Sequence, residues 1–257
     1  MDCAAAMGRG ATAVLDRLAA SLGFLNEATP RFAAALDVAK GGVLLALPAL
    51  LVSGLLRHSS KYFQLPKGFY GLTTIFLLLA FMALARLKSV EQLRYYAPGE
   101  WGKLLGLDRA PEVRTLRIKL KHLADLDQAV PWSAELCKEW MTEAADEATV
   151  LYVDGHVRVY HGTAKQLPKH YVARQRLCLS ATADYWVNAM DGKPFFVGRA
   201  SLSIRDCWRS SNATSFPVLN KMCRTNRAPD NSPPILCFTA LPWCSTGKVT
   251  APPSSPQ

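Results

Sequence analysis

The sequence predicts an α+β protein, with a helical, basic N-terminal region, a short antiparallel sheet and an irregular tail. Apolar residues recur at three- and four-residue steps through much of the first half, which indicates helices. From Thr149 the pattern changes to the alternation and Asp-Gly pairs of strands and tight turns. At Gly198 the composition changes again. The expected parts are residues 1–148, 149–197 and 198–257.

The first segment, residues 11–40, has the spacing of helices. Val14, Leu15 and Leu18 lie at helical steps. Pro30 interrupts the pattern, and because proline fits the first turn of a helix, we expect a second helix to begin there.

Two apolar segments, Gly41–Leu56 and Gly68–Ala85, contain no charged residue. They suggest either a two-span membrane protein with a basic cytosolic domain or a pair of buried helices in a cytoplasmic protein. Both segments fall short of the roughly 20 apolar residues that a span needs. Pro48 also interrupts the first segment, and the chain that follows is polar and basic. These features favour buried helices.

Residues 86–126 read as short basic helices, at Leu87–Tyr96, around Trp101–Leu105 and from Pro111 onward. Short helices joined by tight turns, the last one basic, indicate a possible helix-turn-helix. A solvated amphipathic helix explains the same pattern. The net charge of +10 and pI near 9.4 favour a polyanionic partner, either nucleic acid or an anionic membrane surface. One further amphipathic helix is expected over residues 132–148.

The stretch from Thr149 to Gly162 predicts a β-hairpin. Residues 150–153 suit a strand, and Asp154-Gly155 matches a two-residue turn. A second hairpin is expected around Asp191-Gly192. Asp154 is then either a good turn residue or a carboxylate at the end of a strand. Carboxylates in that position suit the metal-dependent chemistry of phosphoryl transfer, which needs further acids from elsewhere in the chain.

The last sixty residues contain no Glu and only two Asp, and they hold many of the chain's Pro residues together with Cys207, Cys223, Cys237 and Cys244. The seven cysteines are scattered, without metal-like spacing, which argues against a disulfide framework and fits a reducing cytosol.

Several strings in residues 41–197 are distinctive, among them L-R-Y-Y-A-P-G-E-W-G-K-L-L-G-L-D-R, P-E-V-R-T-L-R, L-Y-V-D-G-H-V-R-V-Y and D-Y-W-V-N-A-M-D-G-K-P-F-F-V. In these the chain resembles bacterial insertion-sequence transposases of the DDE type. The resemblance implies a ribonuclease-H-like domain whose first metal-binding Asp ends the first strand, which corresponds to Asp154. It also implies a cytoplasmic protein rather than two membrane spans.

The tail departs from this family, whose second Asp and Glu lie beyond the first three strands. When the codons of Pro242–Pro252 are read from their third base, the shifted frame permits V-F-D-R-E-G-Y-S-P, which is similar to the family's second catalytic strand. We therefore interpret residues from about 198 onward as out-of-frame translation that truncates the transposase. The alternative is an authentic disordered tail. An out-of-frame tail is expected to be poorly ordered, with few contacts to residues 1–197.

The resemblance implies metal-dependent DNA cleavage and strand transfer, with Mg2+ or Mn2+ as cofactor and insertion-sequence ends as partner. Self-association is a further expectation. With one acid of three, this chain is expected to be inactive. Asp154 is the expected catalytic and metal residue. The expected DNA-binding residues are Lys103, Arg109, Arg114, Arg117, Lys119 and Lys121.

Overall fold

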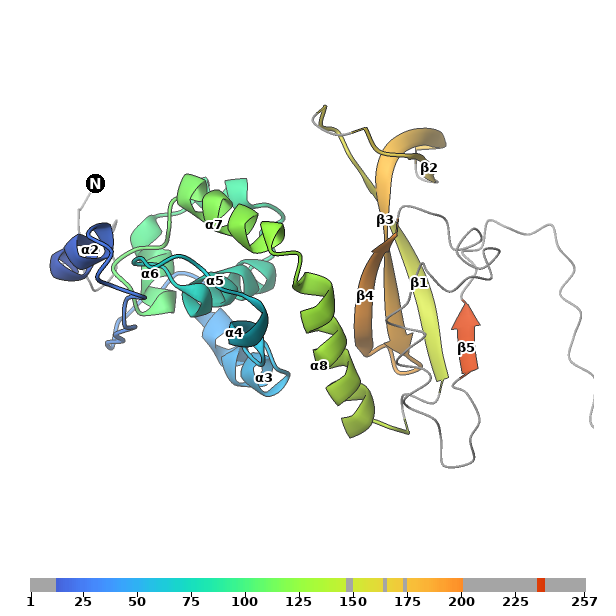
Figure 1. The fold of residues 1–257 in the computed structure, drawn as a ribbon, viewed down its shortest axis with the longest axis horizontal. Helices are drawn as coiled ribbons and strands as arrows, with labels where there is room; N and C mark the ends of the chain where they lie inside the picture. The colour runs from blue at the N-terminus through green and yellow to red at the C-terminus, as the bar shows by residue number, and fades with distance from the viewer. Residues whose placement is uncertain (1–12, 147–149, 164–165, 173–174, 201–234, 239–257) are drawn as a thin grey trace, which may run out of the picture. The chain divides into compact units, whose positions relative to one another are not determined.

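The computed structural model describes residues 13–146, 150–163, 166–172, 175–200 and 235–238 (Figure 1). Helices precede strands along the chain, so the protein is α+β, as the sequence predicts. The chain divides into two compact units, Met1–Trp132 and Ser133–Gln257.

The first unit is built from short helices around one long apolar helix. Its core is centred on Ile75, Leu78 and Phe81 of α5, which are fully buried, together with Trp101 and Leu116. The elements in order are α2 (Val14–Ser21), the 3-10 helix η1 (Gly41–Ala46), α3 (Leu47–Val52), α4 (Ser59–Tyr62), α5 (Leu72–Leu84), the 3-10 helix η2 (Val90–Tyr95), α6 (Pro98–Leu105) and α7 (Val113–Asp125).

The apolar segments form helices too short for a bilayer. Residues 41–52 are split between η1 and α3, and the second segment is reduced to α5. Within the described parts of the chain, no helix has the length and apolar character that a membrane crossing requires. Burial of α5 in the unit's core confirms the prediction of a buried helix for the second segment. The prediction is wrong for the first segment, because neither η1 nor α3 contains a buried residue.

The predicted helix beginning at Pro30 is wrong. No helix lies between α2 and η1. Instead the Ala28 N–H donates to the Phe69 carbonyl at 3.0 Å, and the Arg31 N–H donates to the Gly106 carbonyl at 2.7 Å. Main-chain hydrogen bonds to distant loops thus take the place of the local hydrogen bonds of a helix. Tertiary contacts bury Ala28, and they override the local helical preference of this segment.

Helix α8 (Ala129–Glu143) begins in the first unit, and from Ser133 onward it packs against the mixed sheet of the second unit. The long strand β3 pairs antiparallel with three others, and β1 also pairs parallel with β5. The strands are β1 (Val150–Val159), β2 (Lys169–Val172), β3 (Leu177–Ala189), β4 (Pro194–Ala200) and β5 (Ile235–Phe238).

One face of this sheet is apolar because alternate residues of β1 and β3 point to the same side. Leu151 and Val153 of β1 are buried there beside Val187 of β3, and α8 covers them with Cys137 and Met141. The opposite face carries the polar residues of the same two strands, as their register requires.

The predicted turn at Asp154-Gly155 is wrong. Both residues lie within β1, where Asp154 pairs with Trp186 and Gly155 with Tyr185. The alternation of valines beyond Gly155 allows β1 to continue along β3, and this long-range pairing outweighs the local turn signal. The second predicted turn is confirmed. Gly192 takes a φ of 91° between β3 and β4, and its N–H donates to the Ala189 carbonyl at 2.9 Å.

The tail contributes a strand to the sheet. In β5, Ile235 pairs with Val150 and Phe238 pairs with Val153, in parallel register. The expectation of few contacts to residues 1–197 is therefore wrong for residues 235–238. A short apolar run can complete the edge of a sheet through its main chain, whatever the composition around it. Cys207, Cys223 and Cys244 lie outside the described residues.

Candidate functional site

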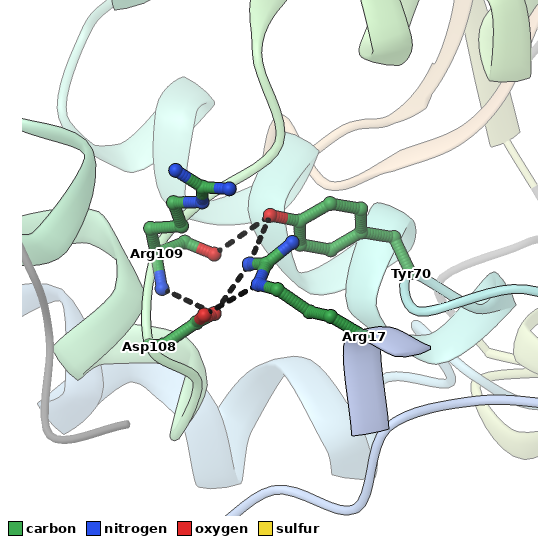
Figure 2. Close-up of polar contacts among 4 residues, drawn as sticks. All are labelled: Arg17, Tyr70, Asp108 and Arg109. Carbon is green, nitrogen blue, oxygen red and sulfur yellow. Dashed lines mark hydrogen bonds and ion pairs between the residues drawn. The ribbon is translucent and has the colours of Figure 1, made fainter. Parts of the chain in front are cut away.

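The loop that carries Arg109, between α6 and α7, is fixed by a buried carboxylate. Asp108 is 3% exposed and accepts hydrogen bonds from both Nε and Nη2 of Arg17, each at 2.6 Å. It also accepts the Arg109 N–H at 2.8 Å, while the Tyr70 hydroxyl donates to the Arg109 carbonyl at 3.1 Å. Figure 2 shows these groups converging from three separate segments. The main chain of Arg109 is thus held from both sides.

Arg17 and Tyr70 both have shifted pKa values in this network. Burial lowers the pKa of Arg17, but hydrogen bonds to Asp108 and Tyr70 outweigh burial and leave the pKa above its usual value. Burial raises the pKa of Tyr70, against an opposing hydrogen bond from Arg17. The guanidinium also lies over the Phe69 ring, 4.0 Å from its centroid. Arg17 is thereby engaged in holding α2 to the loop.

A positively charged stripe, formed by Arg114, Arg117 and Lys121, runs along the exposed side of α7. Its members lie at i, i+3 and i+7 and are exposed, so they share one helix face. Arg117 also forms an ion pair with Glu91 of η2, with 2.7 Å between Nη2 and Oε1. The Arg117 side chain is nevertheless 62% exposed, so its guanidinium remains accessible to an anion.

Lys119 lies away from the charged stripe. It follows buried Leu116 by three residues and precedes buried Leu123 by four, which places it on the side of α7 that faces the core. Burial lowers its pKa, with an opposing contribution from Glu27. Lys119 is therefore less accessible than the residues of the charged stripe, and its predicted role in DNA binding stays a prediction. Its spacing from the two leucines is the sequence signal for this partly buried position.

Lys103 belongs to α6 and is engaged locally. Its Nζ lies 2.7 Å from Oε1 of Glu100, and this contact lowers the pKa of Glu100. The connection from α6 to α7 runs from Gly106 to Glu112, longer than the three- or four-residue turn of a helix-turn-helix. The helix-turn-helix interpretation stays a prediction.

A cavity of about 350 Å³ lies beside the first turn of α7. Its floor is apolar, and Trp101 within it is 1% exposed. Arg94, Tyr96 and Arg114 also line it, together with Glu112. The sequence analysis proposed Arg114 alone among these. Tyr95 and Tyr96 lie within a basic segment, and basic patches interleaved with aromatic residues are typical of nucleic-acid binding. This pattern is the sequence signal that could have identified Tyr96.

Asp154 stands on the polar face of the sheet in the second unit. It is exposed and directly opposite Trp186. Two residues further along β1, His156 lies opposite Asp184, whose Oδ2 is 2.6 Å from Nε of Arg158. The sequence analysis did not single out Asp184, since a polar residue within an apolar strand gives no local signal of its partner.

Comparison with known families matches residues 8–206 of this chain to the family described as Transposase protein. The chain belongs to this transposase family. The resemblance to transposases is thus confirmed at the level of the family. No curated protein and no solved structure matches the chain. Transposases act on DNA, which agrees with the charged stripe and with the net charge of +10.

The described part of this transposase does not hold a ready metal centre. A cleavage centre of the two-metal kind needs several carboxylates converging on the ions. Across residues 13–146, 150–163, 166–172, 175–200 and 235–238, no group of three His, Cys, Asp or Glu side chains is placed to bind a metal. Asp184 is near Asp154 in the register, but its carboxylate is paired with Arg158. The residues that the structure describes therefore do not fit a divalent-metal site.

Proposed function

We propose that this chain is a DNA-binding transposase of the DDE, ribonuclease-H-like type that uses helix α7 to contact insertion-sequence ends. The observation that carries the proposal is the charged stripe of Arg114, Arg117 and Lys121, three exposed cations on one helix face. Such a row matches the regular negative charge of a DNA backbone. Arg109 adds a fourth cation on a fixed loop before the same helix.

The stripe is suited to position DNA rather than to read its sequence. Lysine and arginine side chains on phosphates fix the register of a protein on the duplex and release counterions. Binding should therefore be strong at low salt and fall steeply as salt rises. Lys103 and Lys119 should contribute less, because the Lys103 side chain is only 25% exposed beside Glu100 and Lys119 is half-buried.

Asp154 is the first acid of the proposed catalytic domain. Its support is its exposed position within β1 and the match of residues 8–206 to a transposase family. Mg2+ or Mn2+, when bound by an intact family member, would activate water for attack on a phosphodiester. Since the sequence supplies one identified acid of the three that this chemistry needs, we expect neither cleavage nor strand transfer from this chain.

The out-of-frame origin of the chain from about residue 198 is part of the same proposal. In support, the family match ends at residue 206, close to the change in composition. The nucleotide sequence from codon 198 onward tests it. A transposase-like continuation with an Asp and a Glu in a shifted frame is expected, and its absence in both shifted frames would refute the proposal of a frameshift.

The experiment for DNA binding is a salt series with a labelled duplex and fluorescence anisotropy. The double variant Arg114→Gln/Arg117→Gln should bind DNA with a weaker salt dependence. The slope of log affinity against log salt concentration should fall by about 2. Lys119→Gln is the matched control, because it removes a charge from the same helix outside the stripe. Equal effects of stripe and control substitutions, or binding that ignores salt, would contradict the proposal.

A further inference from the structure

The cavity beside α7 combines three features of a nucleotide site. It has a volume of about 350 Å³, an apolar floor with Trp101, and charged residues at its margin. Ligand pockets in proteins begin at about 300 Å³ and combine apolar walls with a few placed polar groups. We propose that this cavity, named here the α7 cavity, receives one unstacked nucleotide of a DNA strand. The inference rests on the proposed DNA-binding function and extends it.

Tyr96 supplies an aromatic surface in the lining of the α7 cavity. Its side chain is 37% exposed, and its ring contacts Trp101 edge-on with 6.0 Å between centroids. A base removed from the duplex loses its stacking interactions with the neighbouring bases. Stacking on an aromatic ring replaces part of that lost interaction. Stacking on Tyr96 accepts any base, because every base has a π face.

The cations around the cavity match the phosphates that flank such a base. Arg94 and Arg114 line the cavity from η2 and from the first turn of α7, and both are exposed. Lys40 does not line the cavity, but its Nζ lies over the Tyr96 ring, 4.9 Å from the ring centroid. Arginine binds phosphate oxygens through paired N–H groups, so Arg94 and Arg114 suit this role.

Glu112, the one carboxylate in the lining, suits the base rather than the phosphate. It repels a phosphate but accepts hydrogen bonds from the amino group of a base. The carboxylate and the apolar lining thus distinguish the α7 cavity from a simple phosphate site, which requires neither. The arrangement also explains why the cavity adjoins the charged stripe, since Arg114 belongs to both.

The test uses the full chain and three labelled duplexes of equal length. One is fully paired, one carries a single unpaired nucleotide, and one carries an unpaired abasic sugar at the same position. Extrusion costs least for a base that is already unpaired. The affinity for the duplex with an unpaired nucleotide should exceed the affinities for the other two by about 10-fold. The abasic duplex controls for the flexibility that a bulge introduces.

Tyr95 provides a matched control for Tyr96. It is the adjacent residue, it is 85% exposed and it does not line the cavity. Tyr96→Ala should abolish the preference for the unpaired nucleotide, while Tyr96→Phe and Tyr95→Ala should retain it. Circular dichroism of each variant checks that its fold is kept.

The possible outcomes separate this inference from the function on which it rests. Salt-sensitive binding with equal affinity for the unpaired and abasic duplexes would overturn the α7 cavity as a nucleotide site and leave DNA binding intact. The same follows if Tyr96→Ala and Tyr95→Ala behave alike. Absence of binding to all three duplexes at low salt would overturn both.

Discussion

Replacing Asp108 with Asn tests the buried network that fixes the α6–α7 loop. The carboxylate accepts two charge-assisted bonds from Arg17 and lies 3% exposed. Such bonds contribute about 1.5–3 kcal/mol each, against about 0.5–1.5 for neutral ones, so two weakened bonds cost about 2 kcal/mol. The new amide group turns a donor toward the guanidinium, which adds about 1 kcal/mol or more for an unpaired buried group. The total is about 3 kcal/mol, at the lower end of the range for breaking a buried ion pair.

Urea unfolding followed by circular dichroism at helical wavelengths measures this loss. With a slope of about 1–3 kcal/mol per molar urea, Asp108→Asn should lower the midpoint by about 1–3 M. The control is Arg94→Gln, which removes the ion pair between Arg94 and Glu91. The two side chains of this pair are 61% and 39% exposed. This substitution should cost less than about 1 kcal/mol.

A coupling measurement completes the test of this network. Arg17→Met alone should be costly because it leaves Asp108 buried without its partner, and adding Asp108→Asn should then cost less than it does in the wild type. If the urea midpoint of Asp108→Asn is no lower than that of Arg94→Gln, the proposed contribution of the buried network is refuted. Additive effects of the two network substitutions would refute it as well.

Three further predictions concern single positions. Gly106→Ala should destabilise by about 1–2 kcal/mol in urea unfolding, because Gly106 has φ 68° and the added Cβ would lie 3.0 Å from the Phe32 ring; no loss would contradict this. Burial raises the pKa of Tyr70, so stability present below pH about 10 should fall as pH rises further, and Tyr70→Phe should flatten that decline. Amides of β5 should be protected from hydrogen exchange, and Leu236→Pro should abolish that protection.

The fold was predictable where burial and local pattern agree. Helix α5 follows from an uninterrupted apolar run, and the turn before β4 follows from Asp191-Gly192, where glycine meets the required positive φ. Asp154-Gly155 has the same two letters but lies inside a strand, because its surroundings pair with β3. Local sequence cannot distinguish the two cases, since the difference lies in residues about thirty positions away along the chain.

The candidate site was predictable only in part for a similar reason. Arg114, Arg117 and Lys121 form a stripe that helical spacing places on one face. The same spacing assigns Lys119 to the side of α7 that faces the core. Counting the basic residues of the helix does not reveal this difference. The α7 cavity joins Arg94 and Tyr96 of one segment to Trp101 and Arg114 of others. That juxtaposition depends on how η2 packs against α7, and no motif encodes it.

The parallel pairing of β1 with β5 has a consequence for the order in which the second unit folds. Val150 pairs with Ile235, so this contact closes a far longer loop than the pairing of β3 with β4. Loop closure costs more entropy as the loop lengthens, and contacts distant in sequence slow folding. During synthesis β1, β3 and β4 leave the ribosome well before β5, so we expect them to associate first. Until β5 arrives, one side of β1 offers unpaired main-chain groups to any neighbouring chain.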